Sequence, residues 1–268
     1  MQSLKRIVAS VLLSAVIITA NAQYADSTVT LIQLSDSTVP KKIKWVTPTP
    51  IQRLSTKSLI IPVAMMTYGL TTLGNNGHKG INEEFNEEVW TEHPHKLNHM
   101  DTYLQFAPAV SVYALNAFGI KGKNNFRDRT MIYLMSNIFV NAIVYPTKKI
   151  AHQLRPDGSN YNSFPSGHTA EAFASAEFMR QEYKDVSPWY GVAGYAMAAT
   201  TGYLRMYNQK HWFSDVIAGA GVGIFSTKLA YWLYPKIQHS LFKDKHPNTV
   251  VMPTYQNGSF GVGMVHKF

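Results

Sequence analysis

Residues 216–234 have the sequence VIAGAGVGIFSTKLAYWLY, an apolar stretch that contains the pair Gly219 and Gly223. Small residues four positions apart lie on one face of a helix and let a neighbouring helix approach closely. Similar apolar stretches lie at residues 58–73, 104–120, 131–145 and 190–204. Their length and composition predict helices, so the sequence indicates an all-α fold with closely packed helices.

A further helix is expected at residues 167–183, and it carries the charged residues Glu171, Glu177, Arg180 and Glu182. Charged side chains are costly in lipid. We therefore expect this helix to line a watery interior or to lie outside a membrane. Most of the apolar stretches are also at or below the length that crosses the hydrocarbon core.

The first 22 residues carry the pattern of a secretory signal peptide. Lys5 and Arg6 form a basic start, an apolar run extends from Ile7 to Ala20, and small residues follow. This run is shorter than the roughly 20 residues of a membrane-spanning helix, so a cleaved signal is favoured over an uncleaved anchor. The sequence thus predicts an exported protein.

Three segments are expected after residue 22. Residues 23–57 contain three prolines, which interrupt any long helix and predict an extended lead-in segment. Residues 58–240 are expected to form a bundle of about six helices with the active site at one end. In the tail, residues 241–268, the turn signal Asn257-Gly258 predicts a short C-terminal β-hairpin.

The composition narrows the chemistry that the chain can perform. It has no cysteine, which excludes disulfides, thiolate catalysis and cysteine-ligated metals. Its formal net charge is +9, and a basic exported protein is expected to meet anionic lipid or a phosphorylated substrate. Five glutamates between residues 83 and 92 predict a solvated helix face. The mean hydropathy of −0.13 is low for a protein that lies wholly inside a bilayer.

Three blocks of polar residues interrupt the apolar sequence, and the first runs from Lys148 to Pro156. Lys148 and Arg155 are seven positions apart, which places both on one face of a helix that Pro156 is expected to end near Arg155. Two cations at the end of a helix can bind a phosphate. Taken alone, this block fits two surface cations better.

The second block, Phe164 to Thr169, precedes the helix expected at 167–183. Ser166 can cap that helix, and Gly167 lets the backbone approach an anion at the helix start. His168 would stand at the same place, where it could donate a proton. A capped turn with a structural histidine explains the block equally well.

The third block runs from Leu204 to Asp215. His211 and Asp215 are four positions apart and would share a helix face, so the carboxylate can fix the imidazole tautomer and leave the other nitrogen free. Arg205 adds a third cation. The His–Asp pair could instead bind a metal, but the sequence has no further Asp, Glu or His cluster to complete the site.

Together the three blocks resemble the type 2 phosphatidic acid phosphatase superfamily. Its pattern is Lys-x6-Arg-Pro, then Pro-Ser-Gly-His, then Ser-Arg-x5-His-x3-Asp. The chain matches every position except one, since Leu204 stands where the family usually has serine. This difference removes a hydroxyl from the edge of the site and leaves the reacting residues intact.

The resemblance implies a role for each matched residue. His211 would be the nucleophile that takes the phosphoryl group, Asp215 would orient it, and His168 would protonate the leaving oxygen. The groups implied to hold the phosphoryl oxygens are Lys148, Arg155, Arg205 and the Ser166–Gly167 backbone. Three cations and a helix start can compensate phosphoryl charge without a metal or another cofactor.

The resemblance therefore predicts a metal-independent phosphatase that hydrolyses a phosphate monoester or diphosphate through a phosphohistidine intermediate. A lipid-linked substrate is favoured: lipid A first, or undecaprenyl diphosphate, phosphatidylglycerophosphate or phosphatidic acid. The expected location is the cell envelope, on a membrane surface or in the bilayer, with the site facing the periplasm. Neither nucleic acid nor an obligate protein partner is expected. The alternatives are a soluble periplasmic acid phosphatase of broad specificity and, less favoured, a vanadium haloperoxidase.

Overall fold

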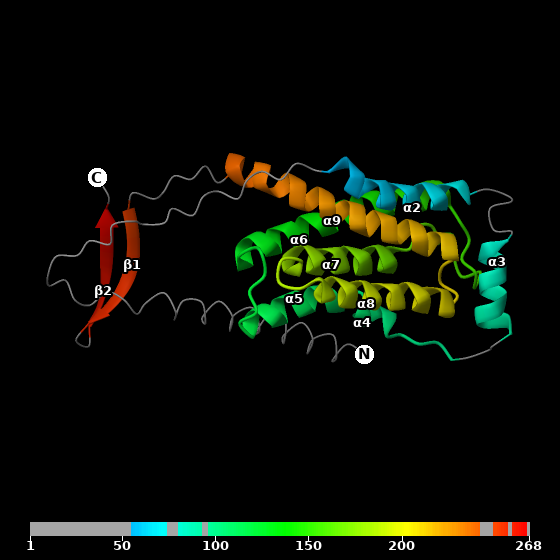
Figure 1. Ribbon diagram of the computed structural model, residues 1–268, viewed down its shortest axis with the longest axis horizontal. Coiled ribbons are helices and arrows are strands. Elements are labelled where there is room, and N and C mark those ends of the chain that lie inside the picture. The colour runs from blue at the N-terminus through cyan, green and yellow to red at the C-terminus, as the bar shows by residue number, and fades with distance from the viewer. Residues whose placement is uncertain (1–54, 74–79, 93–95, 242–248, 257–258, 267–268) are drawn as a thin grey trace. The chain divides into compact units, whose positions relative to one another are not determined.

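The computed structural model describes residues 55–73, 80–92, 96–241, 249–256 and 259–266 (Figure 1). The predicted signal at residues 1–22, most of the lead-in segment and the turn residues 257–258 lie outside these ranges. The predicted division of the chain into segments stays a prediction.

The described chain forms helices from Thr56 to Leu241, which confirms the all-α prediction for this part. Two short helical turns, η1 (Thr56–Leu59) and η2 (Glu87–Thr91), accompany eight α-helices. These are α2 (Ile60–Thr71), α3 (Ile81–Asn86), α4 (Asp101–Leu104), α5 (Ala107–Ala117), α6 (Phe126–Ala151), α7 (Gly167–Tyr183), α8 (Pro188–Tyr207) and α9 (Phe213–Leu241). The longer helices α6, α8 and α9 extend beyond the apolar stretches that predict them, and their added ends include polar residues.

The predicted C-terminal hairpin is also present. Strand β1 (Thr249–Gln256) pairs antiparallel with β2 (Ser259–His266). Gln256 lies opposite Ser259, so the strands are joined by the two residues of the predicted turn signal.

Helix α7 forms the centre of the helical bundle, in contact with α6, α8 and α9 (Figure 1). Its four alanines and Ser175 are fully buried, and they leave room for neighbouring backbones. Gly219 and Gly223 of α9 face α7 closely, since an added Cβ on either would overlap a backbone oxygen of Ser166 or Ala170. The small-residue pair therefore does what the sequence predicts: it brings two helix axes together.

The charged residues of α7 are paired inside the bundle and do not line a watery interior. Glu177 is fully buried and accepts hydrogen bonds from Arg180 at 2.6 Å and Tyr195 at 2.5 Å, with Lys228 of α9 at 3.1 Å. Glu182 accepts a hydrogen bond from Tyr231 at 2.6 Å. A carboxylate can be buried at tolerable cost when such partners compensate its charge.

One helix of the described chain is long and apolar enough to cross a membrane, the segment Phe213–Gln238 of α9. Its apolar window is 67% buried inside the protein, which equally suits the core helix of a bundle. The outer faces of the other helices carry exposed apolar side chains, among them Ile61 on α2, Leu134 and Ile138 on α6 and Val192 on α8.

Candidate active site

The three polar blocks meet at one end of the helical bundle. The first covers the last turn of α6 and the residues after it, the second leads into α7, and the third joins α8 to α9. Three hydrogen bonds tie these segments together. The Asp157 N–H donates to the Gln209 carbonyl (3.2 Å), the Ser166 N–H to the Asp215 carbonyl (3.0 Å), and Trp212 Nε1 to the Leu154 carbonyl (2.9 Å).

Lys148 and Arg155 do not share a helix face, contrary to the prediction. Helix α6 ends at Ala151, and His152 follows it in the left-handed region with φ 44°, so Arg155 lies in the loop. The Arg155 N–H donates to the Asn160 carbonyl at 3.1 Å, and Lys148 Nζ donates to the carbonyls of Asn162 and Ser163. The loop thus folds back over the end of α6 and returns Arg155 to the site.

His211 and Asp215 are adjacent and buried, at 3% and 0% exposure, but they do not share a helix face, since His211 precedes α9. Nδ1 of His211 lies 3.6 Å from Oδ2 of Asp215, which is longer than a hydrogen bond. That oxygen instead accepts hydrogen bonds from Ser163 Oγ at 2.5 Å and from the Trp212 N–H at 2.9 Å. Ser163 and the loop backbone thus fix the carboxylate beside the imidazole.

Burial lowers the pKa of His211 well below its usual value, and nearby cations, first Arg205, lower it further. The imidazole is therefore neutral at physiological pH, as a nitrogen nucleophile requires. Burial and then Arg205 also lower the pKa of His168, to about 4. A bound phosphate would bring negative charge beside His168 and favour its protonation.

The arginines of the site have buried donors that are available to an anion. Nε of Arg155 and Nε of Arg205 are buried, and neither has a hydrogen-bond partner in the described part of the chain. Lys148 lies beside the start of α7, since a Cβ added to Gly167 would lie 4.0 Å from Lys148 Cε. Ser166 caps this helix, its Oγ accepting from the Thr169 N–H at 3.4 Å. Unpaired guanidinium donors and a helix start are groups that can bind an anion.

Asp101 is a residue of the site that the sequence analysis missed. Its Oδ2 accepts a hydrogen bond from Arg205 Nη1 at 2.5 Å, and the residue is 1% exposed. No motif marks it, and the partners are 104 positions apart. The one signal that the sequence offers is that Asp101 is an acidic residue just before the apolar stretch that begins at Leu104.

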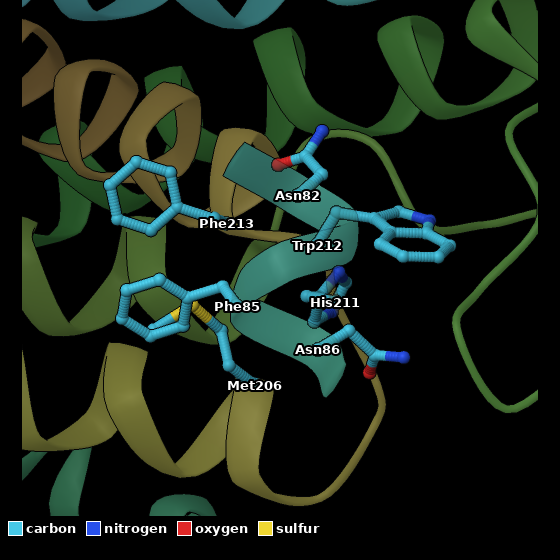
Figure 2. A pocket seen from close by; sticks show the side chains of 7 residues that line it. All are labelled: Asn82, Phe85, Asn86, Met206, His211, Trp212 and Phe213. Carbon is cyan, nitrogen blue, oxygen red and sulfur yellow. The ribbon is translucent and has the colours of Figure 1, made fainter. Parts of the chain in front are cut away.

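A small hollow adjoins His211, enclosed on one side by α3 (Figure 2). It has about 200 Å³ of empty space, part of it open to solvent, and its lining includes Phe85, Asn86 and Met206. Asn82 attaches α3 to the start of α9, exchanging two hydrogen bonds of 3.0 Å with Ser214. The exposed glutamates of α3 and η2 form the predicted solvated face, and the opposite face of α3 covers the site.

Among the residues that the structure describes, no group of three or more His, Cys, Asp or Glu side chains is arranged to hold a metal ion. Metal independence stays a prediction. All eight residues predicted for the site nevertheless lie in the three segments that meet at this end of the bundle.

Comparison with known proteins shows which family this region resembles. The family model of the PAP2 superfamily matches residues 129–239, which include all three polar blocks. The resemblance drawn from the motifs is thereby confirmed for this part of the chain.

One curated relative is the Lipid A 1-phosphatase of Porphyromonas gingivalis, 40% identical over 135 residues. The match covers 50% of this chain and 30% of that protein, so the chain spans less than a third of the relative's length. Two solved structures are similar at 20% identity. The first is LpxE of Aquifex aeolicus, with a TM-score of 0.44, covering 56% of this chain and 94% of that one. The second is a transmembrane PAP2 type phosphatidylglycerolphosphate phosphatase from Bacillus subtilis, with a TM-score of 0.47, covering 69% and 98%.

Proposed function

We propose that the protein is a phosphatase that cleaves a lipid-linked phosphate through a histidine nucleophile, without a metal ion. The observation that carries this proposal is the pair of unpartnered buried Nε atoms on Arg155 and Arg205 beside the neutral imidazole of His211. Phosphoryl transfer demands positioning and charge compensation, which such a site supplies.

In this mechanism Nε2 of His211 attacks phosphorus, because Nδ1 faces Asp215. The bond from phosphorus to the leaving oxygen breaks, and His168 gives that oxygen a proton. Water then attacks the phosphohistidine, His168 takes a proton from that water, and inorganic phosphate leaves. Lys148, Arg155 and Arg205 compensate the charge of the phosphoryl oxygens in both steps.

The favoured substrate is the phosphate of lipid A or a similar phosphorylated glycolipid. The supporting observation is the 40% identity over 135 residues to a protein named Lipid A 1-phosphatase. We further propose that the protein is exported and lies at a membrane with the site facing the periplasm. The exposed apolar side chains of α2, α6 and α8 would then contact lipid.

The test is phosphate release by the purified full chain from lipid A, undecaprenyl diphosphate, phosphatidylglycerophosphate and a soluble monoester. We expect lipid A to be the best substrate and His211→Ala to abolish release while keeping the wild-type circular dichroism. Full activity in His211→Ala would refute the mechanism. A preference for the soluble ester would favour the acid phosphatase, and halide oxidation with vanadate and peroxide would favour the haloperoxidase.

A further inference from the structure

Asp101 is a buried carboxylate that lies outside the three sequence blocks. It begins α4, which packs against α7 and α8. Its Oδ2 pairs with Arg205, whereas its buried Oδ1 has no hydrogen-bond partner among the described residues. A buried carboxylate oxygen without a partner is costly, so a purely structural ion pair would be expected to satisfy it.

The ion pair holds one particular edge of the Arg205 guanidinium. Asp101 occupies Nη1, and the buried Nε remains without a partner in the described chain. Nε and Nη2 form the side-on fork of a guanidinium, which matches two oxygens of a phosphate. Asp101 therefore fixes a long side chain by one nitrogen and leaves its phosphate-binding fork open.

Asp101 also acts electrostatically on His168. Several charged or titratable groups act on this imidazole: Arg205 on α8, Asp101 on α4, Arg155 in the loop, Lys148 on α6 and His211 before α9. Burial and the cations lower the pKa of His168, and the carboxylate of Asp101 raises it. Asp101 thus supplies negative charge that acts on the group that must carry a proton.

The backbone around Asp101 is held independently of the ion pair. The Asn98 N–H donates to Oδ1 of Asn208 at 2.9 Å, and Nδ2 of Asn208 donates to the Asn98 carbonyl at 2.6 Å. Asn208 is the C-terminal cap of α8, three residues after Arg205. The segment before α4 is therefore attached to the end of α8, and a substitution at Asp101 leaves this attachment in place.

We propose that Asp101 is a positioning residue for the phosphatase reaction proposed above. It orients the open fork of Arg205 toward the phosphoryl oxygens, and its negative charge acts on His168. When His168 gains a proton, the carboxylate stabilises the imidazolium until the proton passes to the leaving oxygen.

The first test is Asp101→Asn in the full chain, assayed by phosphate release across pH. We expect kcat to fall roughly 10- to 100-fold, because a misoriented group costs that much. KM should stay the same or fall, since the site becomes more positive. In the profile of kcat against pH, the decline caused by loss of the His168 proton should move to lower pH. The reason is that the variant lacks the negative charge that raises the pKa of His168. Asp101→Glu keeps the charge and should restore much of kcat and the pH of this decline.

The matched control is Asp128→Asn, which removes a carboxylate bonded to Tyr234 at 2.7 Å near the start of α6. This position is about 30 Å from Lys148 along the helix, at 1.5 Å per residue. Its kcat, its KM and the pH of this decline should equal those of the wild type. The inference is overturned if Asp101→Asn behaves like this control, or loses only thermal stability.

A second measurement separates the inference from the proposed function. The titration of His168 is followed by NMR in protein labelled with ¹⁵N-histidine, with His168→Gln used for assignment. Its pKa should fall in Asp101→Asn and stay unchanged in Asp128→Asn. If the wild type releases no phosphate, the proposed function fails, and this titration still decides whether the charge of Asp101 acts on His168. An unchanged His168 pKa in Asp101→Asn would overturn the inference.

Discussion

Asp215 shows how the site is organised at the scale of single residues. Its carboxylate accepts hydrogen bonds from Ser163 Oγ and the Trp212 N–H, so these groups and not His211 fix its position. The spacing of His211 and Asp215 predicts their proximity correctly, but it does not reveal Ser163, which precedes Asp215 by 52 positions. Asp101 escaped prediction for the same reason, since its contact with Arg205 depends on how distant segments fold together.

Ser163→Ala tests the support of Asp215. It removes a hydroxyl that donates to a buried carboxylate oxygen, so we expect a loss of about 1–3 kcal/mol in the free energy of unfolding. Phosphate release should fall as well, because the carboxylate beside His211 is no longer fixed. Thermal unfolding and a phosphate assay measure both effects. Ser159→Ala, in the exposed part of the same loop, should match the wild type in both.

The lowered pKa of Lys148 leads us to expect that anion binding depends on pH. Burial lowers the pKa of Lys148 to about 8, so the ammonium group is charged below that pH and neutral above it. Inhibition by inorganic phosphate should therefore weaken as the pH rises through about 8. Lys148→Arg keeps its charge over this range and should remove that change. Measured inhibition constants that stay flat for the wild type would contradict the prediction.

Helix α6 illustrates what can be predicted at the scale of elements. The sequence predicts its apolar centre, and Pro156 limits how far it can extend. The helix nevertheless ends earlier, at Ala151, because His152 adopts a left-handed conformation and donates its N–H to the Lys148 carbonyl. The usual residue at such a helix end is glycine, and sometimes asparagine, so the sequence around His152 gives little warning of it. The start of α7 at Gly167, by contrast, follows directly from the cap at Ser166.

The contact between α7 and α9 depends on glycine. An added Cβ at Gly223 would overlap the backbone of Ala170, so Gly223→Ala must push the helices apart. We expect it to destabilise the protein by about 1–3 kcal/mol, measured as a lower thermal midpoint in detergent. Gly167→Ala is the control, because its Cβ would meet Val144 at an ordinary 3.7 Å. Equal midpoints for the two variants would show that this contact is not tight.

At the scale of the whole molecule, apolar residues occur on both the inside and the outside of the bundle. The sequence predicts helices from these residues but cannot tell the two sides apart, because long helices with apolar residues all round lack a clear polar face. The structure separates them: Val140 and Val144 face α7, whereas Leu134 and Ile138 on the same helix are 53% and 56% exposed. The exposed set is the surface that we propose for lipid.

The double variant Leu134→Lys, Ile138→Lys tests this surface. It should move the protein from the membrane pellet toward the soluble fraction, since charged side chains are costly in lipid. Hydrolysis of a soluble phosphate ester should be retained. Val186→Lys, in the turn before α8, adds charge away from the helix faces and should pellet like the wild type. If the wild type itself stays in the supernatant without detergent, the proposed membrane location is wrong.

The pairing of Glu177 with Lys228 also bears on how the chain assembles during synthesis. Glu177 is made some fifty residues before Lys228, which belongs to the last helix of the described bundle. Until α9 emerges, α7 has Arg180 as its neighbouring cation but lacks the partner that completes the cluster, and its small-residue face is uncovered. Helix α7 is therefore the centre of the finished protein and among the last parts to reach its final environment. A chain interrupted before residue 228 should be a substrate for quality-control proteases.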